Sequence, residues 1–98
     1  MILVIGSVTA QPGRYQEALA LSQEHVARSR TEPGCVAHAV HRDTENPDRL
    51  VFVEEWVDRA SLQQHFKVPA SRAFAKALAA LASQPQSMTV YDASKLGA

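Results

Sequence analysis

The sequence contains only one cysteine, Cys35, among 98 residues. A lone thiol can form neither an internal disulfide nor a zinc cluster of cysteines, which is typical of proteins in a reducing compartment. The sequence also lacks an excess of either charge, because ten Lys and Arg balance ten Asp and Glu. Nucleic acids and anionic membranes select basic surfaces. We therefore expect neither nucleic acid nor a membrane as a partner.

Long apolar runs and common catalytic motifs are also missing. The apolar start, residues 1–10, is too short to span a membrane and lacks the basic segment that precedes a signal peptide. The sequence contains no HExxH, CxxC, G-x-S-x-G or glycine-rich phosphate loop. His38 and His41 are three residues apart in a predicted strand and would point to opposite faces, so they cannot bind one metal ion together. These absences predict a soluble, cytoplasmic protein without a metal site.

The composition is that of a folded domain. Hydrophobic residues make up 46% and charged residues 20% of the chain, which argues against disorder. A chain of 98 residues supports one core, so we predict a single domain over residues 1–98 that ends in a tail over 92–98. So small a domain buries only roughly 60–70% of its unfolded surface and gains stability from a partner subunit.

Hydrophobic periodicity divides the chain into predicted strands and helices. The order is strand 2–9, helix 14–30, strand 35–42, strand 50–57, helix 58–67, helix 71–82 and strand 88–91. Pro33-Gly34 ends the first helix, and Pro69 separates the two later helical pieces. The resulting β-α-β-β-α-β order predicts an α+β fold, the ferredoxin-like split βαβ.

The strand predicted at 50–57 is apolar on both faces. Val51, Val53 and Val57 occupy the face opposite to Leu50 and Phe52. Both faces of such a strand need a cover, and one layer of helices covers only one of them. A second copy of the chain is the simplest cover for the other face, so we predict a homodimer.

His65, Trp56 and Glu54 are the candidates for a catalytic site. His65 lies between Leu62 and Phe66 beside the apolar face of its predicted helix, and the ordinary histidine pKa of about 6.5 suits proton abstraction. Glu54 shares a strand face with Trp56, and a buried carboxylate there needs a partner, which His65 would provide. Trp56 has the ring to wall an aromatic pocket. The competing interpretation is structural: a hydrogen-bonded histidine, a carboxylate that pins the strand end and a core tryptophan.

His38, Phe66, Arg72 and Phe74 are the candidates for substrate binding. His38 shares a predicted strand face with Val36, and it suits either a second acid or base of the pocket or a polar group at a dimer seam. Arg72 suits an anionic substrate or a solvated helix surface. The two phenylalanines suit the pocket or the core. The remaining two histidines have no functional argument in the sequence.

Three short motifs are similar to those of one protein family. E-P-G-C (residues 32–35) begins the second predicted strand, E-E-W (54–56) ends the third, and His65 follows nine residues later on the next helix. Together with the element order and the length, this pattern resembles the antibiotic biosynthesis monooxygenase domain, the family of small quinol and anthrone monooxygenases. His38 departs from the pattern, because many members carry a tyrosine near this point.

The resemblance implies a dimeric α+β barrel, in which two sheets pack face to face and each subunit keeps a pocket between its sheet and helices. It also implies oxidation of a quinol-like or polycyclic phenolic molecule by O₂, with no metal, haem or flavin as cofactor. Such a substrate, once deprotonated, passes an electron to O₂ itself, so the protein supplies a dry pocket, orientation and a proton acceptor. In these roles His65 is the proton acceptor, Trp56 the stacking wall and Glu54 the group that orients His65.

Two other functions fit the same sequence. Some members of the resembled family process a phosphorylated signal molecule without oxidation, and His38, His65 and Arg72 would suit its polar groups. The other alternative is a dimeric module that binds a small molecule, or acts in stress, without catalysis. Haem-degrading relatives bind iron through a histidine on the last helix, whereas residues 71–82 contain no histidine.

Overall fold

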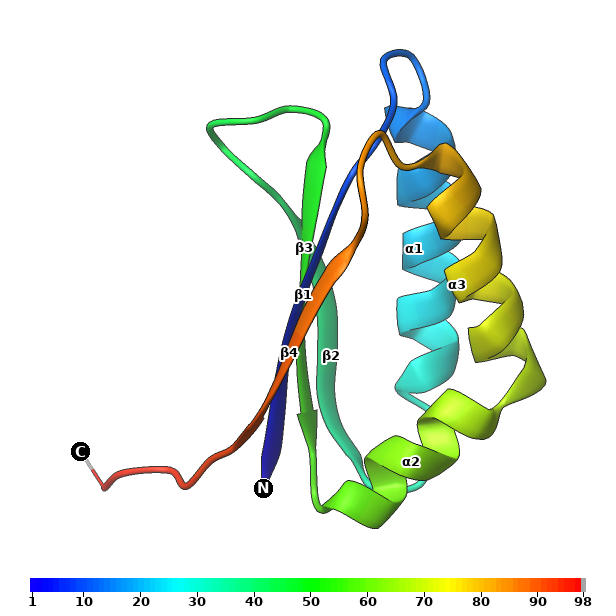
Figure 1. The fold of residues 1–98 in the computed structure, drawn as a ribbon. Coiled ribbons are helices and arrows are strands. Elements are labelled where there is room, and N and C mark those ends of the chain that lie inside the picture. The colour runs from blue at the N-terminus through cyan, green and yellow to red at the C-terminus, as the bar shows by residue number, and fades with distance from the viewer. Residues whose placement is uncertain (98) are drawn as a thin grey trace.

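A four-stranded sheet with three helices on one face makes up the computed structural model, which describes residues 1–97 (Figure 1). The elements are, in chain order, β1 (Ile2–Thr9), α1 (Tyr15–Ser29), β2 (Cys35–Arg42), β3 (Arg49–Trp56), α2 (Arg59–Lys67), α3 (Pro69–Leu81) and β4 (Ser87–Asp92). This confirms the predicted α+β, ferredoxin-like fold, with element ends within two residues of those expected. Residues 93–97 of the predicted tail contain no helix or strand, and Ala98 lies outside the described residues.

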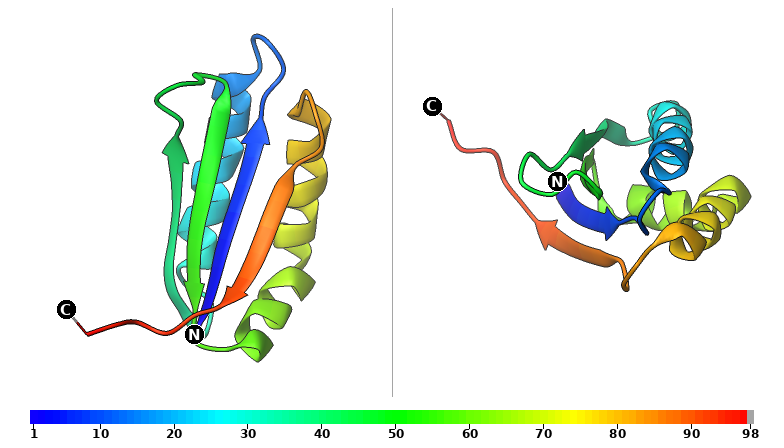
Figure 2. Two further views of the ribbon diagram at one scale, coloured as in Figure 1. Left: turned by 60° about the vertical axis from the view of Figure 1, so that its left-hand side comes forward. Right: turned by 90° about the horizontal axis from the view of Figure 1, so that it is seen from above.

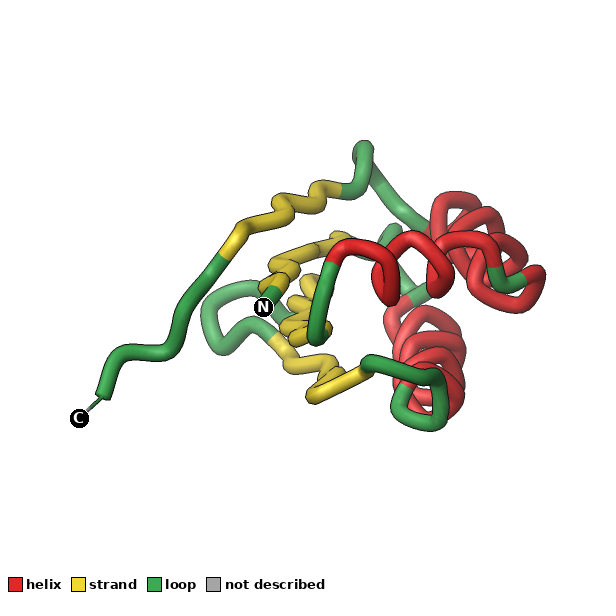
Figure 3. Tube along the Cα trace, turned by 90° about the horizontal axis from the view of Figure 1, so that it is seen from below, coloured by secondary structure: helices red, strands yellow, loops and turns green. Residues whose placement is uncertain are grey.

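The strands lie in the order β2-β3-β1-β4, and each neighbouring pair is antiparallel (Figure 2). The two views of the chain from its ends show all helices on one side of this sheet (Figures 2 and 3). The opposite face of the sheet has no cover from the described residues (Figure 1). Enclosed side chains therefore lie between the sheet and the helical layer.

Local sequence signals set the ends of α2 and α3. Asp58 is the N-cap of α2, and its carboxylate accepts a hydrogen bond of 2.8 Å from the backbone N–H of Ser61. Pro69 occupies the first turn of α3, where its missing N–H leaves no helical hydrogen bond unmade. Pro69 thus starts α3, two residues before the predicted helix start at Ser71.

The turn from α1 into β2 depends on Gly34. Its φ of +82° lies in the left-handed region, where a side chain is strained. A Cβ at this position would also overlap the side chain of Ser61 at the start of α2. The glycine of the E-P-G-C motif therefore lets α2 pack closely against this turn.

A register shift at the start of β2 corrects one expectation. Cys35 pairs with Trp56, and the shift between Cys35 and Ala37 places both Cys35 and His38 on the helix-facing side. The strict alternation predicted for this strand, with Val36 on the face of His38, is therefore wrong: Val36 is 55% exposed, whereas Cys35 packs against the core. Burial raises the pKa of the Cys35 thiol, as do the nearby carboxylates, so Cys35 is not a reactive thiolate.

The core consists of two apolar clusters at opposite ends of the helical layer. The larger one joins Val8, Leu50 and Phe52 of the sheet to side chains such as Val26 on α1 and Leu78 on α3. Burial of such side chains is the main stabilising contribution to the fold. Among the described helices, none combines the length and the apolarity needed to cross a bilayer.

The smaller cluster contains Trp56, Ile2, Val4 and Leu62. Along β3, every second residue from Leu50 to Trp56 is buried against the helices. In this row Glu54 lies between Phe52 of the larger cluster and Trp56 of the smaller one. A polar layer therefore separates the two apolar clusters.

Candidate active site

Three histidines from three different elements meet in this polar layer. His25 comes from α1, His38 from β2 and His65 from α2, and all three are buried. The distances between ring centroids are 5.3 Å for His25–His38, 5.2 Å for His25–His65 and 5.7 Å for His38–His65. We call these residues the histidine cluster.

His65 is held by an acidic partner that was not predicted. Its Nδ1 lies 2.7 Å from Oε1 of Glu32, in the turn before β2. A carboxylate only accepts hydrogen bonds, so Nδ1 carries a ring proton, and in the neutral imidazole the lone pair is then on Nε2. Glu32 belongs to the E-P-G-C motif, and this motif was the one feature of the sequence that pointed to Glu32 as a residue of the site.

Glu54 contacts a different set of groups from the one expected. The indole N–H of Trp56 donates a hydrogen bond of 3.0 Å to Oε1 of Glu54, and Nε2 of His38 lies 3.3 Å from the same oxygen. The predicted pairing of Glu54 with His65 is therefore wrong, because Glu32 takes that place. Burial opposes the ionisation of Glu54, but the neighbouring His38 and the Trp56 N–H outweigh it, and the pKa of Glu54 is below its ordinary value.

His25 is, with Glu32, a site residue that the sequence reasoning missed. Its Nδ1 accepts a hydrogen bond of 2.7 Å from the guanidinium of Arg28, which also donates to Ser71 Oγ at 3.3 Å. Its ring stacks on Phe74 with centroids 3.9 Å apart. Burial, then the other two histidines and Arg28, lower the pKa of His25 from 6.5 to about 3. His25 is thus a neutral imidazole at physiological pH.

One signal in the sequence did point to the position of His25. The buried stripe of α1 includes Ser22, Val26 and Ser29, and His25 follows Ser22 by three residues and precedes Ser29 by four. This is the spacing of one helix face. A histidine in that stripe must be buried, and a buried imidazole needs polar partners.

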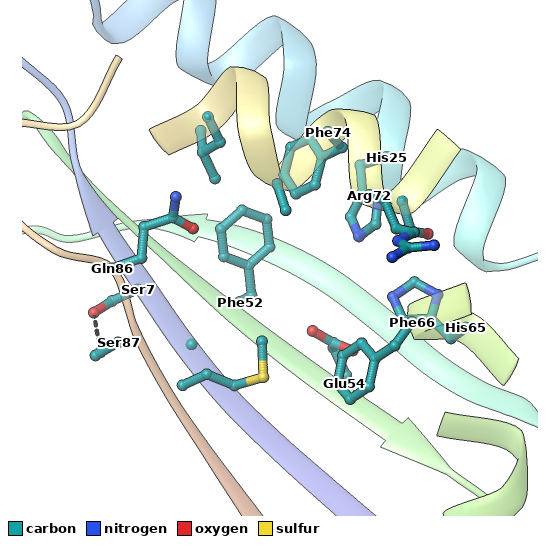
Figure 4. Close-up of a pocket in the computed structure, with 15 residues that line it drawn as sticks. Ser7, His25, Phe52, Glu54, His65, Phe66, Arg72, Phe74, Gln86 and Ser87 are labelled. Carbon is teal, nitrogen blue, oxygen red and sulfur yellow. Dashed lines mark hydrogen bonds between the residues drawn. The ribbon is translucent and has the colours of Figure 1, made fainter. Parts of the chain in front are cut away.

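A cavity of about 170 Å³ opens beside the cluster, between the sheet and α3 (Figure 4). His25, His65 and Glu54 are among the polar residues that line it. Of the predicted substrate-binding residues, Phe66, Arg72 and Phe74 line it as well, and Phe52 adds a third aromatic ring, as Figure 4 shows. The cavity thus joins an aromatic surface to a set of hydrogen-bonding groups.

Two predicted site residues lie behind the cavity wall instead of on it. Trp56 is fully buried, and its ring centroid is 4.7 Å from that of His65. The expected stacking wall is therefore formed by the phenylalanines, while Trp56 supports His65 and Glu54 from behind. His38 is also buried and reaches the cavity only through its neighbours.

Known proteins share both the sequence pattern and the fold of this chain. Residues 1–77 match the model of the family described as antibiotic biosynthesis monooxygenase. A protein of Escherichia coli named Probable quinol monooxygenase YgiN is 27% identical over 88 residues, covering 80% of this chain and 85% of that protein.

An uncharacterized protein of Synechocystis is 32% identical over 90 residues, which cover 92% of this chain. The chain spans 61% of the length of that relative. A crystal structure described as an antibiotic biosynthesis monooxygenase superimposes with a TM-score of 0.90 at 30% identity, over 97% of this chain and all of the other.

Proposed function

Because this chain belongs to the antibiotic biosynthesis monooxygenase family, we propose that it oxidises a quinol-like or related phenolic small molecule with O₂ and no bound cofactor. The observation that carries this proposal is the hydrogen-bonded pair of His65 and Glu32 at the wall of an aromatic-lined cavity. The quinol monooxygenase named among the relatives supports the substrate class.

The proposed reaction is balanced without an external reductant. The substrate gives up two hydrogen atoms, one oxygen atom of O₂ enters the product, and the other leaves as water. A quinol thereby becomes a hydroxyquinone, and the substrate supplies the electrons. The protein is left with the tasks of binding, orienting and deprotonating the substrate.

His65 is the proposed proton acceptor. Nε2 has the lone pair that takes the phenolic proton, and Glu32 stabilises the imidazolium that forms, because the carboxylate lies 2.7 Å from Nδ1. The rings of Phe52, Phe66 and Phe74 offer surfaces for stacking the aromatic substrate. Their apolar surface also excludes water from the deprotonated substrate.

The size of the cavity favours a small substrate. Its volume of about 170 Å³ is below the roughly 300–1,000 Å³ of clefts that enclose drug-sized ligands. We therefore favour a one- or two-ring quinol over a larger polycyclic phenol.

The test is O₂ uptake with reduced menadione, a two-ring quinol, in the presence of the purified protein. We expect His65→Gln to lower the protein-dependent rate by roughly 100- to 10,000-fold, the usual contribution of a general base. His41→Gln is the matched control, because His41 is exposed. Uptake that the protein does not accelerate, or equal rates for His65→Gln and wild type, would overturn the proposal.

Glu32 is tested as a positioning residue. Glu32→Gln keeps the size of the side chain, but its amide can also donate to Nδ1 and so reverse the tautomer of His65. We expect a lower kcat, a nearly unchanged KM and an altered pH profile. A general loss of folding would instead remove substrate binding as well.

A second candidate function is the non-oxidative processing of a phosphorylated small molecule. Ser71 and Arg72 line the cavity beside His25, and this favours an anionic group at that end. The two functions differ in their need for O₂. Turnover of a phosphorylated substrate at the same rate with and without O₂ would favour the second function.

A further inference from the structure

The imidazole of His38 is fully buried, yet neither of its ring nitrogens has a hydrogen-bond partner among the described residues. Oε1 of Glu54 approaches Nε2 at 3.3 Å but without the alignment of a hydrogen bond. A buried polar group that lacks a partner costs free energy. A ligand that binds His38 from inside the polar layer would remove this cost.

The other two histidines place ring nitrogen atoms close to those of His38. One ligand atom from each of His25, His38 and His65 lies within 4.8 Å of the others. To form the base of a tetrahedron around zinc, with metal–nitrogen distances of 2.0–2.1 Å, each nitrogen must move inward by at most about 0.8 Å.

The ring positions already match such a site. Three imidazoles bound to one tetrahedral zinc ion have centroids about 5.3 Å apart, by the same metal–nitrogen distance. The observed centroid distances are 5.2, 5.3 and 5.7 Å. The centroid distances are therefore close to those of such a site, and small rotations of the side chains would bring the nitrogen atoms nearer to one another.

The surroundings supply what a histidine ligand requires. A ligating histidine donates its second ring N–H to a carboxylate, carbonyl or water, and His65 Nδ1 has Glu32 at 2.7 Å. Glu54 and Glu32 also provide negative charge beside the cluster. His25 adds a buried imidazole from α1, the ligand type that suits divalent first-row ions.

We propose that His25, His38 and His65 form a three-histidine site for a divalent first-row transition ion, with Zn²⁺ as the best match. Imidazole nitrogen suits zinc, copper, nickel and iron, and zinc accepts three histidines in tetrahedral geometry. The fourth position faces the cavity, because His25 and His65 form part of its wall.

Arg28 is the group that opposes the ion. Its guanidinium donates to Nδ1 of His25, which leaves the ring proton on Nε2, the nitrogen that remains for the metal. Metal binding moves that proton to Nδ1 and breaks the contact, while Arg28 keeps Ser71 as a partner. Arg28→Gln removes the charge and offers an amide oxygen to Nδ1–H, so it should bind the ion more tightly than the wild type.

The proposal does not rest on the monooxygenase function. Metal binding and quinol oxidation would both use the lone pair on His65 Nε2, so an ion at the cluster removes the proposed proton acceptor. Zn²⁺ is therefore expected to inhibit quinol oxidation. Metal binding itself is measured without any turnover, so that the two proposals fail or hold separately.

The test is a Co²⁺ titration of the metal-free protein, followed by the visible absorption of tetrahedral cobalt and repeated in competition with Zn²⁺. We expect one ion per chain. His38→Gln and His25→Gln should each weaken binding at least about 100-fold. Loss of an outer-shell partner costs roughly 10- to 100-fold, and loss of a metal ligand should cost at least the upper value. His41→Gln is the matched control and should bind as the wild type does, while Arg28→Gln should bind about tenfold more tightly.

A measurement on the wild-type protein guards against variants that do not fold. Long-range ¹H–¹⁵N spectra resolve the histidine rings, and equimolar Zn²⁺ should shift the three cluster rings together and leave His41 unchanged. A shift of the His41 ring alone, a pattern that omits one cluster ring, or no shift would each overturn the three-histidine site.

Discussion

The two faces of the sheet differ in what covers them. On the helix-covered face, Trp56 and Val4 are fully buried and His38 nearly so. On the open face, Ile5 is 36% exposed and Val53 is only partly buried. The helix-covered face therefore packs against the core and the histidine cluster, whereas the apolar side chains of the open face have no cover from the described residues.

The two faces of the single strand β3 need different kinds of contact. β3 supplies Phe52, Glu54 and Trp56 to the covered face, and Val51 and Val53 to the other. The covered face combines apolar packing with one polar layer, whose groups need specific partners. The open face needs only a cover, because contiguous apolar patches on soluble proteins mark contact sites.

The largest effect is expected from truncating the covered face. Trp56→Ala removes a fully buried ring and the indole N–H that binds Glu54. The cavity and the lost partner should lower the free energy of unfolding by about 3–5 kcal/mol. Urea unfolding followed by circular dichroism measures this change.

Tyr91→Ala is the matched control for the open side. Tyr91 lies on β4 with 48% of its surface exposed. In the isolated monomer, where this side chain faces solvent, its truncation should lower the free energy of unfolding by less than about 1 kcal/mol, as for other surface substitutions. If Tyr91→Ala and Trp56→Ala lower the free energy of unfolding equally, the expected difference between the two faces is wrong, and β4 contributes to stability as much as the core does.

The next effect compares His25, which is buried between α1 and the sheet, with the exposed His41 of β2. The pKa of His25 falls from 6.5 to about 3 in the folded state, so the unfolded chain binds the extra proton first as the pH drops. The stability from a neutral His25 is complete above pH 6.5 and is lost towards pH 3. Between pH 6.5 and 4.5 the free energy of unfolding should fall by about 2 kcal/mol through this group.

Urea unfolding at pH 6.5, 5.5 and 4.5 measures this dependence. His25→Gln should flatten it, whereas His41→Gln should leave it as in the wild type, because His41 is exposed. A pH dependence that survives in His25→Gln would show that another group of the covered face takes up the proton. Glu54 does not account for a change between pH 6.5 and 4.5. Its pKa is lowered in the folded protein, so the stability that its ionised form contributes is lost only at more acidic pH.

The fold was predictable because its signals are local. Asp58 caps α2, Pro69 starts α3 and the apolar periodicity marks each element. The shift at Cys35 was not predictable, because a bulge depends on how two strands pair and not on the composition of one. Strict alternation therefore misplaced Val36.

The site was predictable only in part. His65, Glu54 and Phe74 were found through their motif or helix positions, and all three line the cavity. Their partners were not found, because His25 and Glu32 come from segments far away in the sequence. The contact between His65 and Glu32 joins residues 33 positions apart, and no spacing rule within a single element reveals such a pair.

The smallest effect concerns the cover of the open face, for which we propose a second copy of the chain. Ile5 and Val53 are paired across β1 and β3 on this face, beside the exposed strand β4. Val53→Asp would place a carboxylate without a partner in such an interface. We expect it to weaken association at least about tenfold, which is about 1.4 kcal/mol.

Sedimentation equilibrium at micromolar concentration measures this effect. The wild type should sediment as a dimer, Val53→Asp should contain monomer, and Gln63→Asp should remain a dimer, because it adds the same charge to an exposed position of α2. A wild-type monomer would contradict the proposed homodimer. If Val53→Asp instead remains a dimer with unchanged affinity, the two copies meet through another surface, and the open face then contributes neither to stability nor to assembly, in contrast to the covered face.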